Sequence, residues 1–586
     1  MSVSGIVQKL KIFQRPAERF IMPLILLLWP LFASNQGINI ADGMYSLGNY
    51  KFLGNAGSAG STWFFATFLS NLWGKFLTGL PGGGTMLGMN IMTALTVSAT
   101  ALVSYYLLRR LIPGWMVFIG EFIAECLCWC PANILYNYLT YFFLTLGVLF
   151  LFLAVTSVPE KKRWFILAGV CLGVNVTVRF SNIAEAALIL TLWLAAVWTH
   201  TGLAKTIKQT LLCILGYITG FGAVLVMCAV MYGGTAYFAM IPQLFGMTSS
   251  ASDYTLVSMI SDTLSAYAHS LRWFLILIPC IIMGFFLFSM PLVKKKPLIG
   301  KTIYIAGILV VFRFFFSRGM FTVNYQDYWC MFQWAMLFVI MAIIECVICM
   351  AGAAASDPGE RFLAAACLIL ILILPLGSNN YTFPLVNCLF VIAPFALWML
   401  RRFRVHERGK LTGFAWSSMA VALVLALVVQ GKLFHMNFAF GDGTDGTKRT
   451  ASALGISYLK GMKTTPENAQ SLTELGESIH GNKCGTCSLK LIAMGNAPGL
   501  NVIFDREPAL STTWPDLDSY STESFSTELG TLTDPDDRPL IIIHNDSTVN
   551  DFATTADKRK LLRDYIAAND YTELEVNAAY IVYTPE

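Results

Sequence analysis

The apolar run "FIMPLILLLWPLFAS" at residues 20–34 indicates the fold class, and "NIADGMYSLGNYKF" at residues 39–52 follows it closely. The first run carries no charged residue and, with its flanks, is long enough for a membrane-spanning helix. The second run places one carboxylate, Asp42, between apolar flanks and adds Tyr45, Asn49 and Tyr50. The lone acid directly outside the first membrane segment is therefore the first feature of the sequence that needs an explanation.

The composition divides the chain into two regions. Of its 586 residues, 56% are hydrophobic and 13% are charged, whereas soluble globular proteins carry roughly 25% charged residues. Residues 1–436 hold 28 Lys and Arg against 13 Asp and Glu, and residues 437–586 hold 12 against 22. We therefore predict a basic, apolar transmembrane region over 1–436 and an acidic C-terminal domain over 437–586.

About thirteen apolar segments have the length of a membrane span. They lie at roughly 18–35, 85–108, 112–130, 134–157, 163–179, 183–199, 209–231, 272–291, 302–317, 329–350, 362–377, 383–400 and 412–433. The first segment is expected to be an uncleaved anchor, because "LFASN" lacks the paired small residues that precede a signal-peptide cleavage site.

Basic residues in the connectors predict the orientation. Cations precede the first segment and follow every second segment after it, as at Arg109 and Arg110 and again at Lys161, Lys162 and Arg163. The positive-inside rule assigns these connectors to the cytoplasm. This distribution explains the basic charge without a nucleic-acid partner. The predicted fold is an α-helical polytopic membrane protein of about 13 transmembrane helices, with a cytoplasmic N-terminus and an extracytoplasmic C-terminal α/β domain.

The long first external loop, residues 36–84, contains "FATFLSNLWGKFL" at 65–77. Its apolar residues recur at spacings of three and four, which predicts a helix lying in the membrane interface. The stretch "DYTLVSMISDTLSAY" at 253–267 has a weaker version of the same pattern.

The C-terminal region has the patterns of an α/β domain. Short apolar runs predict buried strands at 489–494, 500–504, 539–544 and 578–584. Helices are expected at 464–479, with Thr465 as N-cap, and at 556–568. Cys484 and Cys487 are interpreted as structural, with a local disulfide as one option outside the membrane. A metal site there would need two further ligands, and only His480 lies nearby.

Several polar groups fall on the predicted outer side of the membrane. Arg179 ends the fifth segment and Glu185 opens the sixth, while Arg313 and Arg318 lie in the outer half of the ninth. The corners "NYQDYW" at 324–329 and "GSNNY" at 377–381 contribute Asp327, Asn379 and Asn380. Charged groups at membrane depth are costly and usually face a cavity or a partner.

Together these features resemble the GT-C superfamily of integral-membrane glycosyltransferases, in particular the bacterial, polyprenyl-phosphosugar-dependent type. The resemblance covers the architecture of the whole chain. In residues it rests on "ADGMYSLGNYKFL", which is similar to the family's first-loop motif, and on "GVCLGVNVTVRFSN", similar to its glycine-rich span that ends in Arg. One departure is that Gly43 stands where many relatives carry a second acid. That loop also has no DxD, so no motif supports a divalent cation.

The resemblance implies a mechanism and a set of site residues. A sugar on a polyprenyl phosphate would be attacked by an acceptor hydroxyl at the extracytoplasmic face, with inversion and with Asp42 as general base. The implied substrate-binding residues are Tyr45, Arg179, Arg313, Arg318, Asp327, Asn379 and Asn380. The acceptor would be a cell-envelope polymer, a lipid or a protein, and membrane lipids would surround the helices.

Other interpretations of the same residues stay open at this stage. Asp42 could act only as a helix N-cap, and the arginines could extend to lipid headgroups as simple anchors. Asp327 could serve only to satisfy one of the arginines. Glu121 and Glu125, four residues apart in the third segment, could form a proton relay of a transporter or lipid flippase. A third alternative is a structural or sensory membrane protein with an external binding domain.

Overall fold

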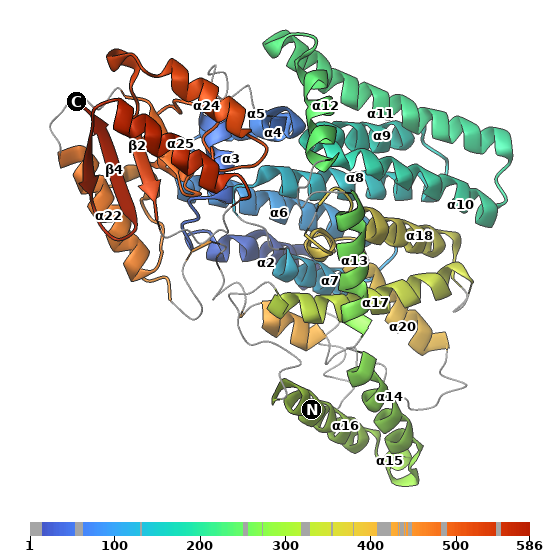
Figure 1. The fold of residues 1–586 in the computed structure, drawn as a ribbon. Helices are drawn as coiled ribbons and strands as arrows, with labels where there is room; N and C mark the ends of the chain where they lie inside the picture. Colours follow the sequence, from blue (N-terminus) through green and yellow to red (C-terminus); the bar gives the residue numbers. More distant parts are fainter. Residues whose placement is uncertain are drawn as a thin grey trace.

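The structure is a computed structural model. It describes residues 14–52, 62–128, 132–249, 256–271, 274–317, 329–352, 356–378, 380–406, 424–431, 433, 439, 441–442, 448–481, 489–545 and 552–586. Figure 1 shows a body of long helices, with the C-terminal α/β domain at one end of it.

The membrane region is built from helices alone in its described parts (Figure 1). In chain order they are η1(Ala17–Ile21), α2(Met22–Leu28), η2(Trp29–Ala33), α3(Asp42–Lys51), α4(Thr62–Ala66), α5(Phe68–Thr78), α6(Met86–Leu108), α7(Gly114–Leu127), α8(Leu135–Thr156), α9(Lys162–Val178), η3(Phe180–Ile189), α10(Leu190–Thr199), α11(Leu203–Tyr232), α12(Ala236–Ser249), α13(Leu256–Leu271), α14(Phe274–Ser289), α15(Pro291–Lys295), α16(Pro297–Ser317), α17(Trp329–Met350), α18(Pro358–Ile373), α19(Phe383–Val386) and α20(Ile392–His406).

The predicted polytopic helical fold is confirmed. Every predicted segment from 18–35 to 383–400 coincides with one or more helices, whereas most of 412–433 lies outside the described residues. Within the described part of the chain, 6 helices are long and apolar enough to cross a membrane. They are Gln14–Ala33, Met86–Leu108, Leu135–Thr156, Phe180–Thr199, Leu203–Tyr232 and Pro297–Phe314.

Glycines let two helices of the body pack backbone to backbone. A Cβ atom built on Gly169 or Gly173 of α9 would lie 1.9 or 2.0 Å from a carbonyl oxygen of α11. Gly216 and Gly220 of α11 meet α9 in the same way, at 2.1 and 2.4 Å. Small residues four apart on both helices are typical of close helix association in membranes. The glycine-rich sequence of α9 therefore fixes the position of Arg179 at its end.

The helix predicted in the first external loop is present as α4 and α5. Phe68 and Leu77 are buried, whereas the side chains of Trp73 and Phe76 are 42% and 54% exposed. The aromatic ring of Tyr50 packs directly on Gly74, where an added Cβ would lie 2.3 Å away. This arrangement leaves one aromatic face of α5 outward, as expected of an interfacial helix.

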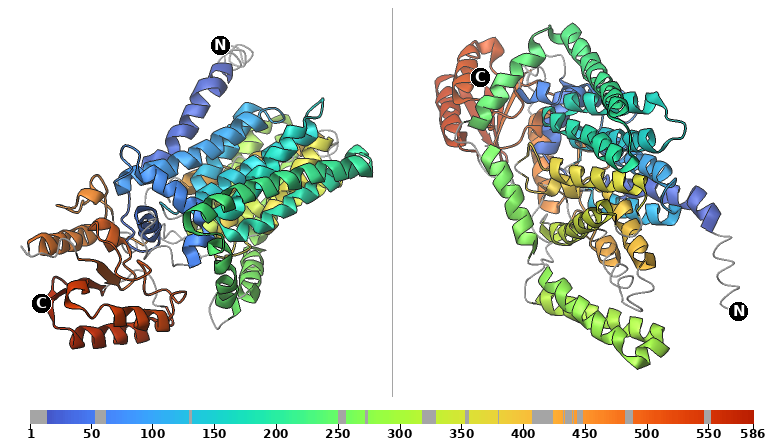
Figure 2. Two further views of the ribbon diagram at one scale, coloured as in Figure 1. Left: turned by 90° about the horizontal axis from the view of Figure 1, so that it is seen from above. Right: turned by 90° about the vertical axis from the view of Figure 1, so that its right-hand side faces the viewer.

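The hairpin α14–α16 lies at the edge of the helical body (Figures 1 and 2). It has its own small core around Cys280, Phe288 and Tyr304, and Val311 and Phe312 of α16 pack against the main core. The hairpin carries Arg313, one of the predicted site residues.

The C-terminal domain is a four-stranded sheet with helices, in the strand order β1-β2-β4-β3. Strand β1 (Leu491–Met494) pairs in parallel with β2 (Leu540–His544). Strand β4 (Tyr580–Pro585) is antiparallel to both β2 and the edge strand β3 (Tyr571–Glu575). The remaining elements are η6(Ser457–Leu459), α22(Pro466–Gly481), α23(Gly499–Ile503), α24(Thr522–Thr531), η8(Pro535–Asp537) and α25(Thr555–Ala568).

The strand predicted at 500–504 is wrong, because residues Gly499–Ile503 form helix α23. A short apolar run does not distinguish a buried strand from a buried helical turn. The Asn501 side chain stabilises the turn by donating to the carbonyl oxygens of Leu491 and Arg506, at 3.3 and 3.2 Å. Thr465 does cap α22 as predicted, since its hydroxyl accepts from the backbone N–H of Asn468 at 3.2 Å.

One hydrophobic core joins the first external loop to the C-terminal domain. Ile38, Met44 and Leu47 of the loop belong to the same cluster as Leu500 and Ile542. Helix α23 packs against α3, where Gly499 contacts the Met44 side chain and donates its backbone N–H to the Ile40 carbonyl at 2.8 Å. The region around Asp42 is therefore built from two parts of the sequence more than 400 residues apart.

Candidate functional site

Asp42 is the first residue of helix α3, and its carboxyl group is not used to hold the helix together. The N-cap of α3 is Ala41, and no side chain makes a capping hydrogen bond there. The interpretation of Asp42 as an N-cap is therefore wrong. Within the described residues the Asp42 carboxylate has no hydrogen bond and no ion pair. Burial raises the pKa of Asp42 from its ordinary 3.8 to about 6.

Gly43 has a steric reason to be glycine. A Cβ atom at this position would lie 2.9 Å from the carbonyl oxygen of Ala132, which is closer than a Cβ atom normally approaches another atom. A second carboxylate next to Asp42 would require the 132–135 segment to move. Glycine at position 43 therefore fits the local packing, and Asp42 is the single acid at this end of α3.

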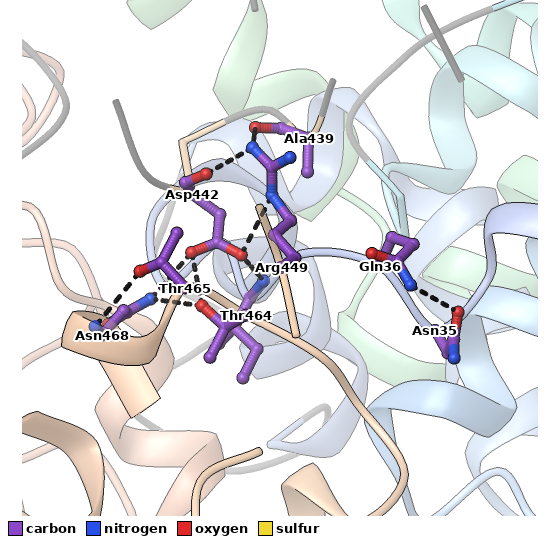
Figure 3. A network of polar contacts seen from close by, with 9 residues as sticks. Asn35, Gln36, Ala439, Asp442, Arg449, Thr464, Thr465 and Asn468 are labelled. Carbon is purple, nitrogen blue, oxygen red and sulfur yellow. Dashed lines mark hydrogen bonds and ion pairs between the residues drawn. The ribbon is translucent and has the colours of Figure 1, made fainter. Parts of the chain in front are cut away.

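The segment in front of Asp42, residues 35–41, is held by the C-terminal domain, and we call it the strap. Figure 3 shows the polar network that holds it, centred on Asp442. The backbone N–H of Ile38 donates to Asp442 Oδ2 at 2.8 Å. Lys463 exchanges backbone hydrogen bonds with Asn35 and Gly37, both at 2.8 Å.

Tyr45 lies one turn after Asp42 on α3 and contacts the C-terminal domain. Its ring packs edge-on against Trp514, with 5.5 Å between the ring centroids. Trp514 is only 3% exposed and donates its indole N–H to Asn496 Oδ1 at 3.0 Å. The C-terminal domain therefore forms a wall beside α3.

Asp516 stabilises this wall. It is fully buried and accepts the backbone N–H groups of Gly495 and Asn496 at 3.2 and 3.0 Å. Burial raises its pKa, and the two backbone hydrogen bonds oppose that effect. Asp516 and Trp514 are thus buried structural residues.

Arg179 is the C-cap residue of helix α9 and is half-buried. Its guanidinium donates to the Gly377 carbonyl at 2.8 Å and lies over the ring of Tyr136, 5.7 Å from the ring centroid. The contact with Gly377 brings the predicted "GSNNY" corner to Arg179. Segment 132–136 connects Arg179 to Asp42, because Gly43 packs on its beginning and Tyr136 lies at its end.

Tyr50 fixes this connecting segment to α3. Its hydroxyl donates to the Asn133 carbonyl at 2.7 Å and accepts the backbone N–H of Leu135 at 3.1 Å. Tyr50 is fully buried, and burial raises the pKa of its hydroxyl. Asp42, Tyr45 and Arg179 are therefore on one continuous assembly of α3, segment 132–136 and the end of α9.

Glu185 lies beside Arg179 in a buried polar cluster. Asn175 donates to Glu185 Oε2 at 2.7 Å, and Asn182 donates to Thr140 Oγ1 at 2.7 Å. Arg179, Glu185, Asn182 and Thr140 all line one small pocket. The acid is thus satisfied by an amide, which leaves the Arg179 guanidinium without a direct carboxylate partner in the described part of the chain.

The other predicted site residues divide into two groups. Arg313 is exposed on α16 and Asn380 is exposed in the corner before α19, where its backbone N–H donates to Ser378 Oγ at 3.1 Å. Arg318, Asp327 and Asn379 lie outside the described residues. Of the described members of the predicted set, Asp42, Tyr45 and Arg179 lie on the assembly of α3, segment 132–136 and the end of α9, and Asn380 lies in the corner whose Gly377 carbonyl binds Arg179. The described residues contain no group of three or more His, Cys, Asp or Glu that could hold a metal ion.

Glu121 and Glu125 lie inside the helical body on α7, 0% and 2% exposed. None of their carboxylate oxygens has a hydrogen-bond partner in the described structure. This pair is the feature on which the transporter alternative depends.

Comparison with known proteins gives similarities of overall structure only. No protein-family model and no curated protein sequence matches the chain. The oligosaccharyltransferase of Archaeoglobus fulgidus, in complex with Zn and sulfate, matches with a TM-score of 0.42 and 11% identity, over 89% of this chain and 68% of that one. The same enzyme tethered to an acceptor peptide matches with a TM-score of 0.41 and 11% identity, over 97% and 75%.

ArnT from Cupriavidus metallidurans, bound to undecaprenyl phosphate, matches with a TM-score of 0.42 and 11% identity, over 99% of this chain and 98% of that one. At this low level of similarity the matches decide neither the substrate nor the catalytic residues, which must be inferred from the site itself.

Proposed function

We propose that this chain is an integral-membrane glycosyltransferase that moves a sugar from a polyprenyl-phosphate donor to an acceptor hydroxyl at the extracytoplasmic face. The observation that carries the proposal is the environment of the Asp42 carboxylate. This carboxylate is partly buried, its pKa is raised to about 6, and no described residue binds it. A carboxylate that is ionised at neutral pH yet only weakly stabilised is suited to accept a proton.

The proposed step is a single displacement. The acceptor oxygen attacks the anomeric carbon and loses its proton to Asp42 Oδ. The bond between the anomeric carbon and the phosphate oxygen breaks, and the polyprenyl phosphate leaves with the electron pair, so that the configuration inverts. A positioned general base contributes roughly 10²–10⁴ in rate.

Arg179 supports the proposed binding of the donor phosphate. Only one hydrogen bond of its guanidinium is made within the described residues, to Gly377, and a guanidinium has five N–H donors. Its planar fork matches a phosphate. The basic connectors support a cytoplasmic N-terminus and an extracytoplasmic domain over 437–586, and in this proposed orientation Asp42 and Arg179 lie on the outer side. Tyr45, Arg313, Arg318, Asp327, Asn379 and Asn380 remain proposed substrate contacts.

A transporter or lipid flippase is the second candidate, because Glu121 and Glu125 are buried without partners. Proteoliposomes loaded with a labelled polyprenyl phosphosugar distinguish the two. A transferase makes a new glycosylated product, whose anomeric configuration NMR should show to be inverted. Movement of the intact lipid across the bilayer without any new product would favour the second candidate. A donor complex with the phosphate remote from Arg179 would contradict the proposed binding site.

A further inference from the structure

We infer that Asp442 is a positioning residue for Asp42, and that the C-terminal domain thereby forms part of the catalytic apparatus. The inference rests on the proposed role of Asp42 and extends it to a region that contributes no residue to the predicted site.

The strap has no helix or strand of its own, so its path depends on what holds it. Four of its backbone groups bind the C-terminal domain. The carbonyl of Asn35 and the N–H of Gly37 pair with Lys463, the N–H of Ile38 donates to Asp442, and the carbonyl of Ile40 accepts from Gly499, each at 2.8 Å. Asp42 follows directly, so its backbone position is set by the C-terminal domain.

Asp442 is the centre of this attachment (Figure 3). Its side chain is 0% exposed and forms an ion pair at 3.5 Å with Arg449, whose side chain is 3% exposed. Oδ1 accepts from Thr464 Oγ1 at 2.6 Å and from Asn468 Nδ2 at 2.9 Å, while Oδ2 accepts from Ile38. Both oxygens are therefore in use, and Asp442 is held by three residues of the C-terminal region while it holds the strap.

The strap is also closely packed where it passes Asp442. Gly37 and Gly441 have positive φ angles of 88° and 64°, and added Cβ atoms there would lie 2.4 Å from Ala439 Cβ and 3.1 Å from the Asn39 side chain. The two segments are in close contact at Gly37 and Gly441. Loss of the Asp442 side chain would therefore leave the backbone N–H of Ile38 buried without an acceptor. The strap must then shift to satisfy it.

A displacement of about 1 Å at a catalytic group costs roughly 10²-fold in rate. We therefore expect Asp442→Ala to lower kcat by roughly 10²-fold, with the donor KM unchanged because Asp442 does not touch the donor. The strap directly precedes Asp42 in the chain, so loosening it should let more water reach the Asp42 carboxylate. When it loosens, the acidic limb of the pH–rate profile should move from about 6 toward the ordinary 3.8. A purely structural role would not move that limb.

The matched control is Asp505→Asn. Asp505 also joins α3 to the C-terminal domain, through an ion pair with Lys51 at 2.8 Å, but its side chain is 81% exposed. Exposed ion pairs contribute little, so kcat should stay within about twofold. Thr464→Val is a milder second variant, which removes one hydrogen bond to Asp442 and keeps the charge pair.

The experiment combines hydrogen–deuterium exchange of peptides covering 35–45 with the kinetics of sugar transfer. Faster exchange in this region, lower kcat and a displaced acidic limb in Asp442→Ala, but not in Asp505→Asn, are expected. If Asp442→Ala does not yield folded protein, Thr464→Val should show the same changes at smaller size. Unchanged exchange in the folded variants, or faster exchange with unchanged kcat, would overturn the inference. Absence of transfer by the wild type would instead refute the proposed function, whatever the exchange shows.

Discussion

Asp42→Asn should make the protein more stable and inactive at the same time. The environment of Asp42 disfavours its charge, because its pKa is raised from 3.8 to about 6 by burial. A group whose pKa is raised on folding contributes stability that is fully present below the unfolded value and is lost as the pH rises through the folded value. Above pH 6 the wild type therefore bears the full cost of the buried charge.

The size of this cost follows from the two pKa values. The difference between 3.8 and about 6 is about two pH units, and at 1.36 kcal/mol per unit it amounts to roughly 3 kcal/mol. Asn has nearly the same shape as Asp and carries no charge. Above pH 7, Asp42→Asn should be more stable than the wild type by up to about that amount, and the gain should disappear at about pH 4.

The assay is thermal unfolding of both purified proteins in lipid nanodiscs between pH 4 and pH 8, followed by intrinsic fluorescence. The difference in Tm should grow with pH and level off above about pH 7. A variant that is less stable than the wild type at pH 8 would mean that the Asp42 carboxylate is stabilised by a partner, and the reasoning about its pKa would fail. Asp505→Asn serves as the control, because it removes an acid whose side chain is 81% exposed and which takes part only in a surface ion pair.

Three further predictions follow from the site and the fold. Arg179→Ala should raise the donor KM by roughly ten-fold or more, and the acceptor KM by less, because it removes a charge-assisted contact of about 1.5–3 kcal/mol. The same donor KM in the wild type and the variant would mean that Arg179 only anchors the end of its helix. A fragment of residues 437–586 should unfold at a higher temperature when residues 34–52 are supplied, since the two share one core; an unchanged unfolding transition would contradict this. A cysteine at the exposed position 526 of α24 should react with an impermeant thiol reagent in intact cells, and reaction only after lysis would reverse the proposed orientation.

The sequence predicts the helices of the membrane region well because their signal is local. Runs of about 20 apolar residues and basic connectors require no knowledge of what packs against what. The interfacial helix α5 was predictable for the same reason, since Trp73 and Phe76 stand out at helical spacing. Arg179 was also recognisable, because a cation at the outer end of an apolar segment departs from the charge pattern.

The tertiary features were beyond this local signal. The edge strand β3 reads "YTELE" and is mostly exposed, so no apolar run marks it, and only its pairing with β4 makes it a strand. The strap depends on a contact that no local pattern predicts. The backbone N–H of Ile38 donates to Asp442, which lies 404 positions further along the chain. The N-cap interpretation of Asp42 failed because Ala41, and not Asp42, precedes the first helical residue.

The central claim is that Asp42 is the base of a sugar transfer from a lipid-linked donor. Its most direct test is a comparison of membranes that contain equal amounts of the wild type and of Asp42→Asn, each supplied with a radiolabelled polyprenyl phosphosugar. The wild type should move label from the lipid fraction into a second product, and Asp42→Asn should do so at least about 10²-fold more slowly. Label that stays on the lipid with the wild type, or equal transfer by a well-folded Asp42→Asn protein, would contradict the account.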